Sequence, residues 1–303
     1  MKEFLLDQGV NESLIDELIK FRKFYSMDNE YMDRVPNPKY RYYGGEILSK
    51  SIAALLAGHN LLLSGPKATG KNVLAENLAM LFSRPMWNIS MNVTSDSASL
   101  LGSDTFVDNE VKMRKGPVYL SSEAGGFCVF DEINMAKNDS LSVIYSALDY
   151  RRVIDVPGYE RVDIHEASRF IGTMNYGYIG TKELNEALVS RFLIIDMPTI
   201  TKDNLKLILK NEFNLNDEYL EVFSNLFMDL QKKSLNAEVS SKPIDLRGLL
   251  SSIETMKKGL DIKNALEMGV VNKTFDQYEK EIVRDVINSL IKDRVESKDI
   301  FLR

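Results

Sequence analysis

The sequence predicts an α/β fold in which a parallel sheet carries a phosphate-binding loop, followed by a region built of helices. Three observations predict this class. The wholly apolar run 61–63 leads through a glycine-bounded loop into a helical pattern at 73–82, which is the context that a phosphate-binding loop requires. A second apolar run, 127–130, ends in two carboxylates. After Pro198 the apolar residues recur almost entirely at helical spacing.

The loop between the first strand and its helix has the composition of an anion site. Its glycines let the backbone turn N–H groups toward an anion at a helix N-terminus, where the helix dipole also favours negative charge. Lys71 can reach the terminal phosphates of a nucleotide. The residues expected to contact the phosphates are Gly65, Pro66, Lys67, Ala68, Thr69, Gly70, Lys71, Asn72 and Val73. The alternative is a plain glycine-containing turn between a strand and a helix.

Asn72 stands where a phosphate-binding loop has a Ser or Thr, whose hydroxyl binds Mg²⁺. A second oxygen ligand is predicted at the end of the strand 127–130, where Asp131 and Glu132 follow the apolar run. Ligand sites in parallel sheets lie at the carboxyl ends of the strands. We therefore expect Asp131 and Asn72 to hold Mg²⁺ and Glu132 to orient the water that attacks the γ-phosphate. Taken alone, two acids after an apolar run also fit the start of a surface turn.

Other strands and segments complete the sheet. Apolar runs predict strands at 87–91, 170–175 and 193–197, and Asn175 ends the second of these near the predicted site. A hairpin is expected around Pro157 and Gly158. The segment 92–117 has no regular pattern, and an excursion of that length in a compact domain is typical of a functional segment.

The N-terminal part is predicted to contain two helices. Asn11 is a candidate cap for the first, and the second is expected near 47–57, after an irregular link. Tyr42 or Tyr43 in this link could stack on a nucleotide base, although ordinary packing fits both as well.

Composition limits the partners and the compartment. The 303 residues include 38 basic and 44 acidic side chains, a net charge of −6, so no overall basic field indicates nucleic acid and protein partners are expected. One cysteine and two histidines are too few for a zinc site or a disulfide framework. No apolar run approaches the roughly 20 residues that span a bilayer, and the start lacks the long apolar core of a signal peptide. We expect no membrane association and a reducing cytoplasm.

The motifs GPKATGK, FCVFDE, TMN and LVSRF, in this order and spacing, resemble the AAA+ ATPases. The longer stretches around FCVFDEINMAKNDS, LDYRRVI and NYGYIGTKELNEALVSRF resemble the MoxR-type group, and within it the CbbQ/NirQ/NorQ branch. The resemblance covers roughly residues 46–260. It implies a P-loop AAA+ domain, a five-stranded parallel sheet flanked by helices, followed by a helical lid domain. The expected parts are an N-terminal helical appendage and linker over 1–45, the AAA+ domain over 46–199 and the lid over 200–303.

The resemblance also implies roles for individual side chains. The positions that match the family's motifs are Lys71 as the Walker A lysine, Asp131 and Glu132 as the Walker B pair, Asn175 as sensor 1, Arg191 as the arginine finger that reaches a neighbour's nucleotide, and Arg247 as sensor 2 of the lid. Arg191 could instead simply open a strand, and Arg247 could be a solvated lid residue. The segments 92–117 and 151–165 match a family insert and hairpin that would face a pore or a client.

The implied function is Mg²⁺-dependent ATP hydrolysis by a hexameric ring that remodels or activates a protein client. Branch members act on metalloenzymes together with a von Willebrand A-domain partner. Two alternatives stay open. Asn72 favours a nucleotide-responsive scaffold with poor turnover, and the TMN segment with a downstream Arg-Phe pair is shared with GTP-dependent, DNA-linked AAA+ motors.

Overall fold

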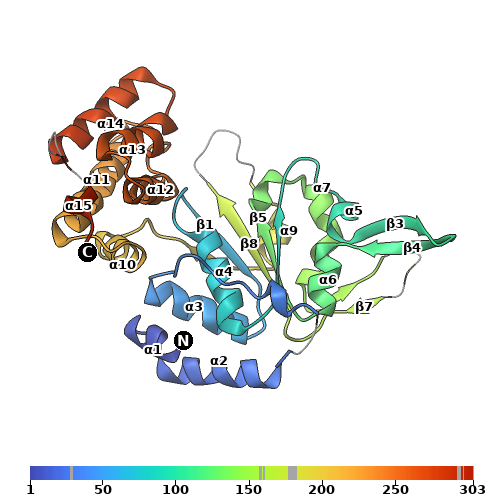
Figure 1. Cartoon of the computed structure of the whole chain (residues 1–303). Helices are drawn as coiled ribbons and strands as arrows, with labels where there is room; N and C mark the ends of the chain where they lie inside the picture. Colours follow the sequence, from blue (N-terminus) through green and yellow to red (C-terminus); the bar gives the residue numbers. More distant parts are fainter. Residues whose placement is uncertain are drawn as a thin grey trace. The chain divides into compact units, whose positions relative to one another are not determined.

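The computed structural model describes residues 1–27, 30–156, 159, 161–176, 183–291, 295 and 297–302 (Figure 1). The chain divides into two compact units. The first consists of Met1–Pro66 and Gly70–Pro198, and the second of Lys67–Thr69 and Thr199–Arg303.

A five-stranded sheet organises the first unit. Its strands are β1 (Leu61–Gly65), β2 (Met86–Ser90), β5 (Phe127–Asp131), β8 (Arg169–Asn175) and β9 (Leu193–Asp196). They lie in the order β2-β5-β8-β1-β9, and every neighbouring pair is parallel. The predicted fold class is confirmed. Because the strands are parallel, the carboxyl ends of β1, β5 and β8 meet at one edge of the sheet.

Helices cover both faces of this sheet, which explains why its central strands are apolar without alternation. One face packs against α1 (Lys2–Asp7), α2 (Glu12–Phe24), α3 (Gly45–Leu56) and α4 (Lys71–Phe82). The other packs against α6 (Pro117–Glu123), α7 (Asn138–Leu141), α8 (Tyr145–Leu148) and α9 (Glu186–Val189) (Figure 1). Along β1, Leu61 and Leu63 enter the first cluster and Leu62 the second. The N-terminal helices therefore share the core of the sheet, and α2 begins at Asn11, whose side chain accepts a hydrogen bond from the Ser13 N–H as expected of a cap.

Buried arginines hold the ends of these helices. Arg84, which is 2% exposed, donates from Nη1 to the carbonyl of Tyr25 (2.6 Å) and from Nη2 to that of Ala124 (3.0 Å). Tyr25 and Ala124 are the C-terminal cap residues of α2 and α6. Arg169 on β8 donates from Nε to the carbonyl of Leu55 in the last turn of α3 (2.6 Å). The last carbonyls of a helix lack partners within it and favour a cation. Arg84 therefore joins the ends of α2 and α6 to each other, and Arg169 joins the end of α3 to β8.

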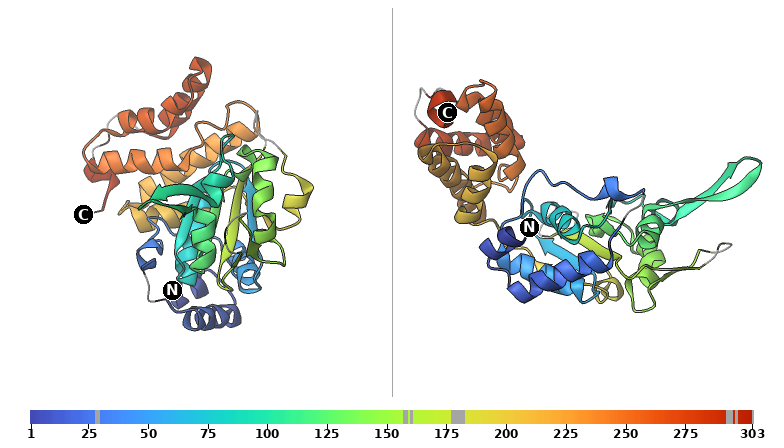
Figure 2. Two further views of the ribbon diagram at one scale, coloured as in Figure 1. Left: turned by 90° about the vertical axis from the view of Figure 1, so that its right-hand side faces the viewer. Right: turned by 60° about the horizontal axis from the view of Figure 1, so that its bottom comes forward.

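The segment 92–117 is more regular than its sequence indicates. It contains α5 (Ser97–Leu100) and an antiparallel hairpin of β3 (Gly102–Val107) and β4 (Glu110–Lys115), which extends away from the rest of the first unit (Figure 2). Its two-residue turn, Asp108 and Asn109, has φ of 53° and 66°, the left-handed conformation that suits a tight hairpin. The expectation of irregular structure was wrong because most side chains of this hairpin are exposed and polar, so no apolar alternation marks the strands.

The predicted second hairpin is present as β6 (Val153–Ile154) paired with β7 (Val162–Asp163); its predicted turn at Pro157 and Gly158 lies outside the described residues. Leu141, Ile144 and Leu148 recur at helical spacing, which predicts one continuous helix there. The structure instead has an interruption, because a 3₁₀ turn, η3 (Ser142–Ile144), separates α7 from α8.

The second unit is built of helices: α10 (Lys202–Glu212), α11 (Asp217–Leu235), α12 (Leu246–Lys257), α13 (Ile262–Gly269), α14 (Gln277–Leu290) and α15 (Ser297–Ile300). Each helix from α10 to α14 starts at a residue whose side chain accepts a backbone N–H: Thr201, Asn216, Asp245, Asp261 and Asp276. These caps explain the sharp helix boundaries of this region. The helical C-terminal region predicted from the periodicity is confirmed.

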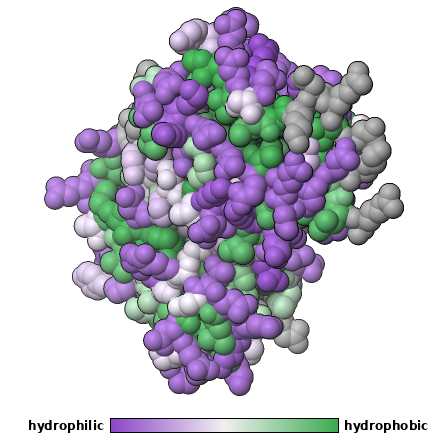
Figure 3. All heavy atoms as spheres, turned by 90° about the vertical axis from the view of Figure 1, so that its left-hand side faces the viewer, coloured by the Kyte–Doolittle hydropathy of each residue, from purple (hydrophilic) through white to green (hydrophobic). Residues whose placement is uncertain are grey.

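On the face drawn in Figure 3, apolar residues form separate patches among hydrophilic ones. Within the described residues, no helix combines the length and apolar character needed to cross a membrane.

Candidate functional site

The phosphate loop joins the end of β1 to the start of α4. Gly65 ends the strand at a position where a Cβ would lie 2.7 Å from the backbone oxygen of Met197, so a side chain there would displace β1 or its neighbour. Gly70 precedes the helix with φ of 83°, which glycine adopts without steric cost. The two glycines of the motif are therefore required by the backbone. The loop ends at the N-terminus of a 12-residue helix, where N–H groups and the dipole favour an anion.

Lys71 is the first residue of α4 and is only 7% exposed. Its Nζ donates to the carbonyls of Gly65 (2.9 Å) and Pro66 (2.7 Å), both in the loop. Burial lowers the pKa of Lys71 to about 8, although the charges of Asp131 and Glu132 act in the opposite direction. The ammonium thus lies at the loop, where a phosphate would be a stronger partner than two neutral carbonyls.

Asp131 and Asn72, predicted as the two metal ligands, are in contact. Asn72 Nδ2 donates to Asp131 Oδ2 (3.0 Å), while Oδ1 of the same carboxylate accepts from Thr173 Oγ1 (2.7 Å). The Asn72 oxygen therefore faces away from Asp131. A carboxylate and an amide oxygen are hard ligands that suit Mg²⁺. Among the described residues, no group of three or more His, Cys, Asp or Glu side chains could hold a metal alone. Because the Asn72 amide nitrogen lies on Asp131, a cation shared by the two side chains would require the amide to turn over.

Glu132 adopts an unusual backbone conformation. It has φ of 55° and ψ of 50°, the left-handed region that non-glycine residues rarely enter. Its N–H donates to Thr173 Oγ1 (3.0 Å), and its Oε1 accepts from Asn175 Nδ2 (2.9 Å). The structure therefore brings together Glu132 and Asn175, which the sequence placed at the ends of two different strands.

Two residues of this network were not predicted from the sequence. Thr173 lies within β8, and Asn134 follows Glu132 in the 3₁₀ turn η2 (Ile133–Met135) and donates from Nδ2 to the Asn175 carbonyl (3.1 Å). Both side chains are buried. A polar residue inside an otherwise apolar buried strand, two positions before Asn175, was the available signal for Thr173.

Arg191 contacts other residues of its own chain, away from the phosphate loop. It donates to the carbonyls of Ala187 and Tyr145, lies over the Tyr145 ring (4.6 Å) and pairs with Asp149 (3.5 Å). None of these contacts involves the phosphate loop. The structure thus does not bring Arg191 together with the loop of the same chain.

Arg247 is the second residue of α12 in the second unit, where its side chain is exposed and its N–H donates to the cap residue Asp245.

Tyr42 packs beneath the phosphate loop. A Cβ on Gly70 would lie 3.4 Å from Tyr42 Cε2, and the backbone N–H of Tyr42 donates to Asn77 Oδ1 (3.2 Å). Burial raises the pKa of its hydroxyl to about 12. Of the two roles considered for Tyr42, the structure favours packing.

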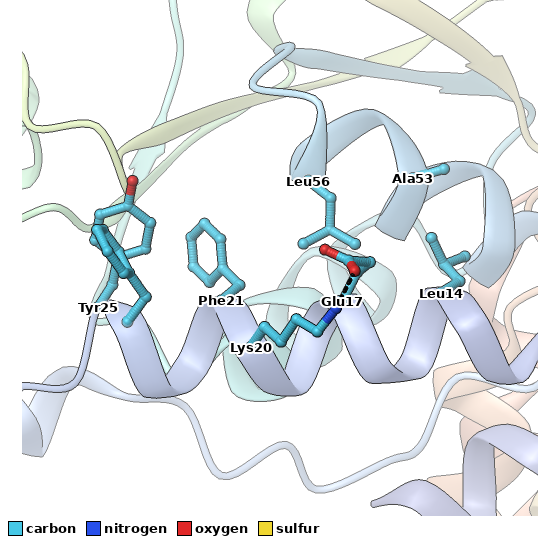
Figure 4. A pocket seen from close by; sticks show the side chains of 8 residues that line it. Leu14, Glu17, Lys20, Phe21, Tyr25, Ala53 and Leu56 are labelled. Carbon is cyan, nitrogen blue, oxygen red and sulfur yellow. Dashed lines mark hydrogen bonds and ion pairs between the residues drawn. The ribbon is translucent and has the colours of Figure 1, made fainter.

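A groove between α2 and α3 lies elsewhere in the first unit. Leu14, Phe21 and Leu56 line it, and an ion pair between Glu17 and Lys20 crosses its edge (Figure 4). It contains none of the predicted site residues.

A glycine loop follows the central parallel strand β1 and leads into a helix, and acidic residues lie at the end of β5, on the other side of β8. This arrangement defines the nucleotide site of a P-loop protein. In agreement, residues 60–192 match the family model described as the AAA domain, dynein-related subfamily.

The chain also has relatives that match most of its length. It is 34% identical over 289 residues to the uncharacterized protein YojN of Bacillus subtilis, covering 93% of this chain and 94% of YojN. It is 34% identical over 238 residues to the uncharacterized proteins SERP0979 of Staphylococcus epidermidis and SH1500 of Staphylococcus haemolyticus, covering 75% of this chain and 89% of each relative. A solved structure from Cytophaga hutchinsonii covers 93% of this chain and 98% of its own, with a TM-score of 0.49 at 15% identity. The chain belongs to the family that includes YojN, and its residues 60–192 match the AAA domain.

Proposed function

We propose that this protein is a Mg²⁺-dependent ATPase whose hydrolysis cycle remodels or activates a protein client. The contact between Glu132 and Asn175 carries the proposal, because it places a carboxylate and an amide together at the sheet edge next to the phosphate loop. The match to the AAA domain supports nucleotide-driven activity.

Each site residue has a chemical task in this proposal. The loop N–H groups and Lys71 bind the phosphates, and Glu132 orients and polarises the attacking water. Asn175 holds the Glu132 carboxylate and can donate to the γ-phosphate or to that water. Mg²⁺, held by Asp131 with Asn72, would supply further charge neutralisation on the β- and γ-phosphates.

Assembly into a hexameric ring completes the proposal. Arg191 lies away from its own loop, which suits a residue that acts on the nucleotide of the next subunit and stabilises the transferring phosphoryl group. We divide the chain into an N-terminal appendage and linker (1–45), a nucleotide-binding domain (46–199) and a lid (200–303), with Arg247 as the lid's contact to the nucleotide. On the motifs given above, we place the protein in the MoxR-type group, as a cytoplasmic chaperone with a von Willebrand A-domain partner.

A second candidate function is a nucleotide-responsive scaffold that binds ATP and turns it over poorly. Asn72 favours it, because its amide nitrogen already occupies Asp131 Oδ2, an oxygen that a metal would need.

Replacing Glu132 by glutamine tests the proposal. Glu132→Gln should retain ATP binding and lose at least roughly 100-fold in turnover, because a positioned base contributes about 10²–10⁴-fold. Lys71→Ala should instead lose binding. The matched control is Glu46→Gln on the exposed first turn of α3, which should keep parental turnover. ATP binding without turnover in the parent would support the scaffold, and GTP preference with DNA stimulation would support a DNA-linked motor.

A further inference from the structure

Strands β5 and β8 separate just before the site. Their ladder runs from Phe127 with Arg169 to Phe130 with Gly172. Beyond it, β8 continues along β1 as far as Asn175, whereas Asp131 pairs with Ser90 of β2. Glu132 and Asn175 therefore lie on strand ends that no backbone hydrogen bond between β5 and β8 connects.

Side chains take over where this ladder stops. Thr173 Oγ1 donates to Asp131 Oδ1 (2.7 Å) and accepts the N–H of Glu132 (3.0 Å). Asn134 Nδ2 donates to the carbonyl of Asn175 (3.1 Å), and Asn175 Nδ2 donates to Glu132 Oε1 (2.9 Å). Thr173 is 1% exposed and Asn134 2%, so water does not compete freely with the bonds that these two side chains make. The bond between Asn175 and Glu132 is itself exposed, so its geometry depends on the buried bonds beside it.

The single hydroxyl of Thr173 has a specific effect on Glu132. A hydroxyl has one proton to donate and lone pairs that accept; here the proton goes to Asp131, which leaves a lone pair for the Glu132 N–H. Glu132 is in the left-handed region, and such a conformation persists only where the surroundings determine it. The direction of the Glu132 side chain toward Asn175 follows from that backbone conformation.

We propose that Thr173 is the positioning residue for Glu132, and that Asn134 fixes Asn175 as its counterpart. Thr173 does not touch the reacting atoms. It sets the backbone of Glu132 so that the carboxylate meets Asn175. The inference rests on the proposed ATPase function for its effect on turnover, and on geometry alone for the contact between Glu132 and Asn175.

The test replaces Thr173 by valine, which has nearly the same shape and no hydroxyl. Hydrogen bonds to charged groups are the stronger ones, so Thr173→Val should lower kcat by about 10- to 100-fold. Metal-free nucleotide affinity should change by less than about threefold, since the phosphate loop is untouched. Thr173→Ser restores the hydroxyl and should recover most of the lost turnover.

A second measurement separates positioning from general damage. The side-chain NH₂ signals of Asn175, recognised in ¹H–¹⁵N spectra by their loss in Asn175→Asp, should shift in Thr173→Val and return in Thr173→Ser. Thr274→Val is the matched control, because Thr274 is also 1% exposed and donates to a carboxylate, Glu279 (2.5 Å), in the second unit. It should leave the Asn175 signals in place.

If Thr173→Val does not fold, Asn134→Ala carries the test and should shift the Asn175 signals and lower kcat. A fall in kcat without a shift of the Asn175 signals, or a shift without a fall in kcat, overturns the inference. In either case turnover does not depend on the contact between Glu132 and Asn175. A parent protein without turnover would refute the ATPase function. The Asn175 signals alone would then decide the positioning role.

Discussion

Raising the pH should weaken nucleotide binding through Lys71. Its ammonium is buried against the Gly65 and Pro66 carbonyls, and burial lowers its pKa to about 8. Phosphate oxygens in the same place favour the charged form, so the pKa must rise in the complex. Nucleotide therefore binds the protonated protein more tightly, and affinity falls once pH exceeds the pKa of the free protein.

The size of the effect follows from that pKa. With a pKa of about 8, the protonated fraction of Lys71 falls about 25-fold between pH 7.5 and 9.5, and affinity should fall by about the same factor. The stability of the free protein responds in the opposite direction. The pKa of Lys71 is about 8 in the folded protein and 10.5 in the unfolded chain. Between these two pH values the unfolded chain binds more protons, so the contribution of Lys71 to stability rises with pH.

Metal-free nucleotide titrations at several pH values measure the slope, and calorimetry in two buffers at pH 8.5 measures the proton taken up. Lys71→Arg keeps a cation that does not titrate in this range, so its affinity should be independent of pH. Lys67→Arg changes an exposed lysine of the same loop and should keep the parental slope. Equal affinity of the parent at pH 7.5 and 9.5, or an equal slope in Lys71→Arg, would refute the reasoning.

Three further predictions concern the metal, the assembly and the core. Asn72→Thr should lower the Mg²⁺ concentration for half-maximal turnover and Asn72→Ala should raise it, because a hydroxyl enters the octahedral shell with less displacement than the longer amide; superimposable Mg²⁺ titrations would exclude Asn72 from the metal site. Arg191→Ala should bind ATP normally and hydrolyse it slowly, and mixing it with Glu132→Gln should recover activity at mixed interfaces; full activity of dilute monomers in sedimentation and turnover assays would contradict this. Arg84→Met leaves buried helix-end carbonyls unpaired and should lower the free energy of unfolding, measured in urea, by about 3–5 kcal/mol. The control Arg161→Met, at an exposed position, should change it by no more than about 0.5 kcal/mol. Equal losses in the two variants would contradict a role for these carbonyls.

The sheet and the strand-end residues were predictable because they follow from one rule. Buried parallel strands are apolar throughout, and their polar ends meet at one edge. Asp131, Glu132 and Asn175 were predicted in this way, and the structure has them at the ends of β5 and β8, with Glu132 and Asn175 in contact. The interruption of the helix at 138–148 was not predictable. Leu141, Ile144 and Leu148 are all buried, and their spacing along the sequence fits a continuous α-helix as well as one interrupted by a 3₁₀ turn.

The supporting contacts depend on information that local sequence patterns do not contain. Thr173 and Asn134 act across two strands that separate at the site, and their partners depend on the register of β5 with β8 and on the left-handed turn at Glu132. The β3–β4 hairpin was missed for a different reason. Its cross-strand pair, Phe106 and Val111, is 70% and 63% exposed, so it buries no apolar face that would mark its strands.

The arginines at the helix ends constrain the order in which the growing chain can fold on the ribosome. The Tyr25 carbonyl at the end of α2 can bind Arg84 only after 59 more residues have been synthesised. The Leu55 carbonyl of α3 can bind Arg169 only after 114 more residues have been synthesised. At about 5–20 residues per second, these delays are about 3–12 s and 6–23 s. The apolar faces of α2 and α3 belong to a core cluster whose later members include Ile171 of β8, so they are not fully covered until that strand has been made. Nascent chains shorter than β8 should therefore engage ribosome-associated chaperones through these two helices, and release should coincide with synthesis of Arg169.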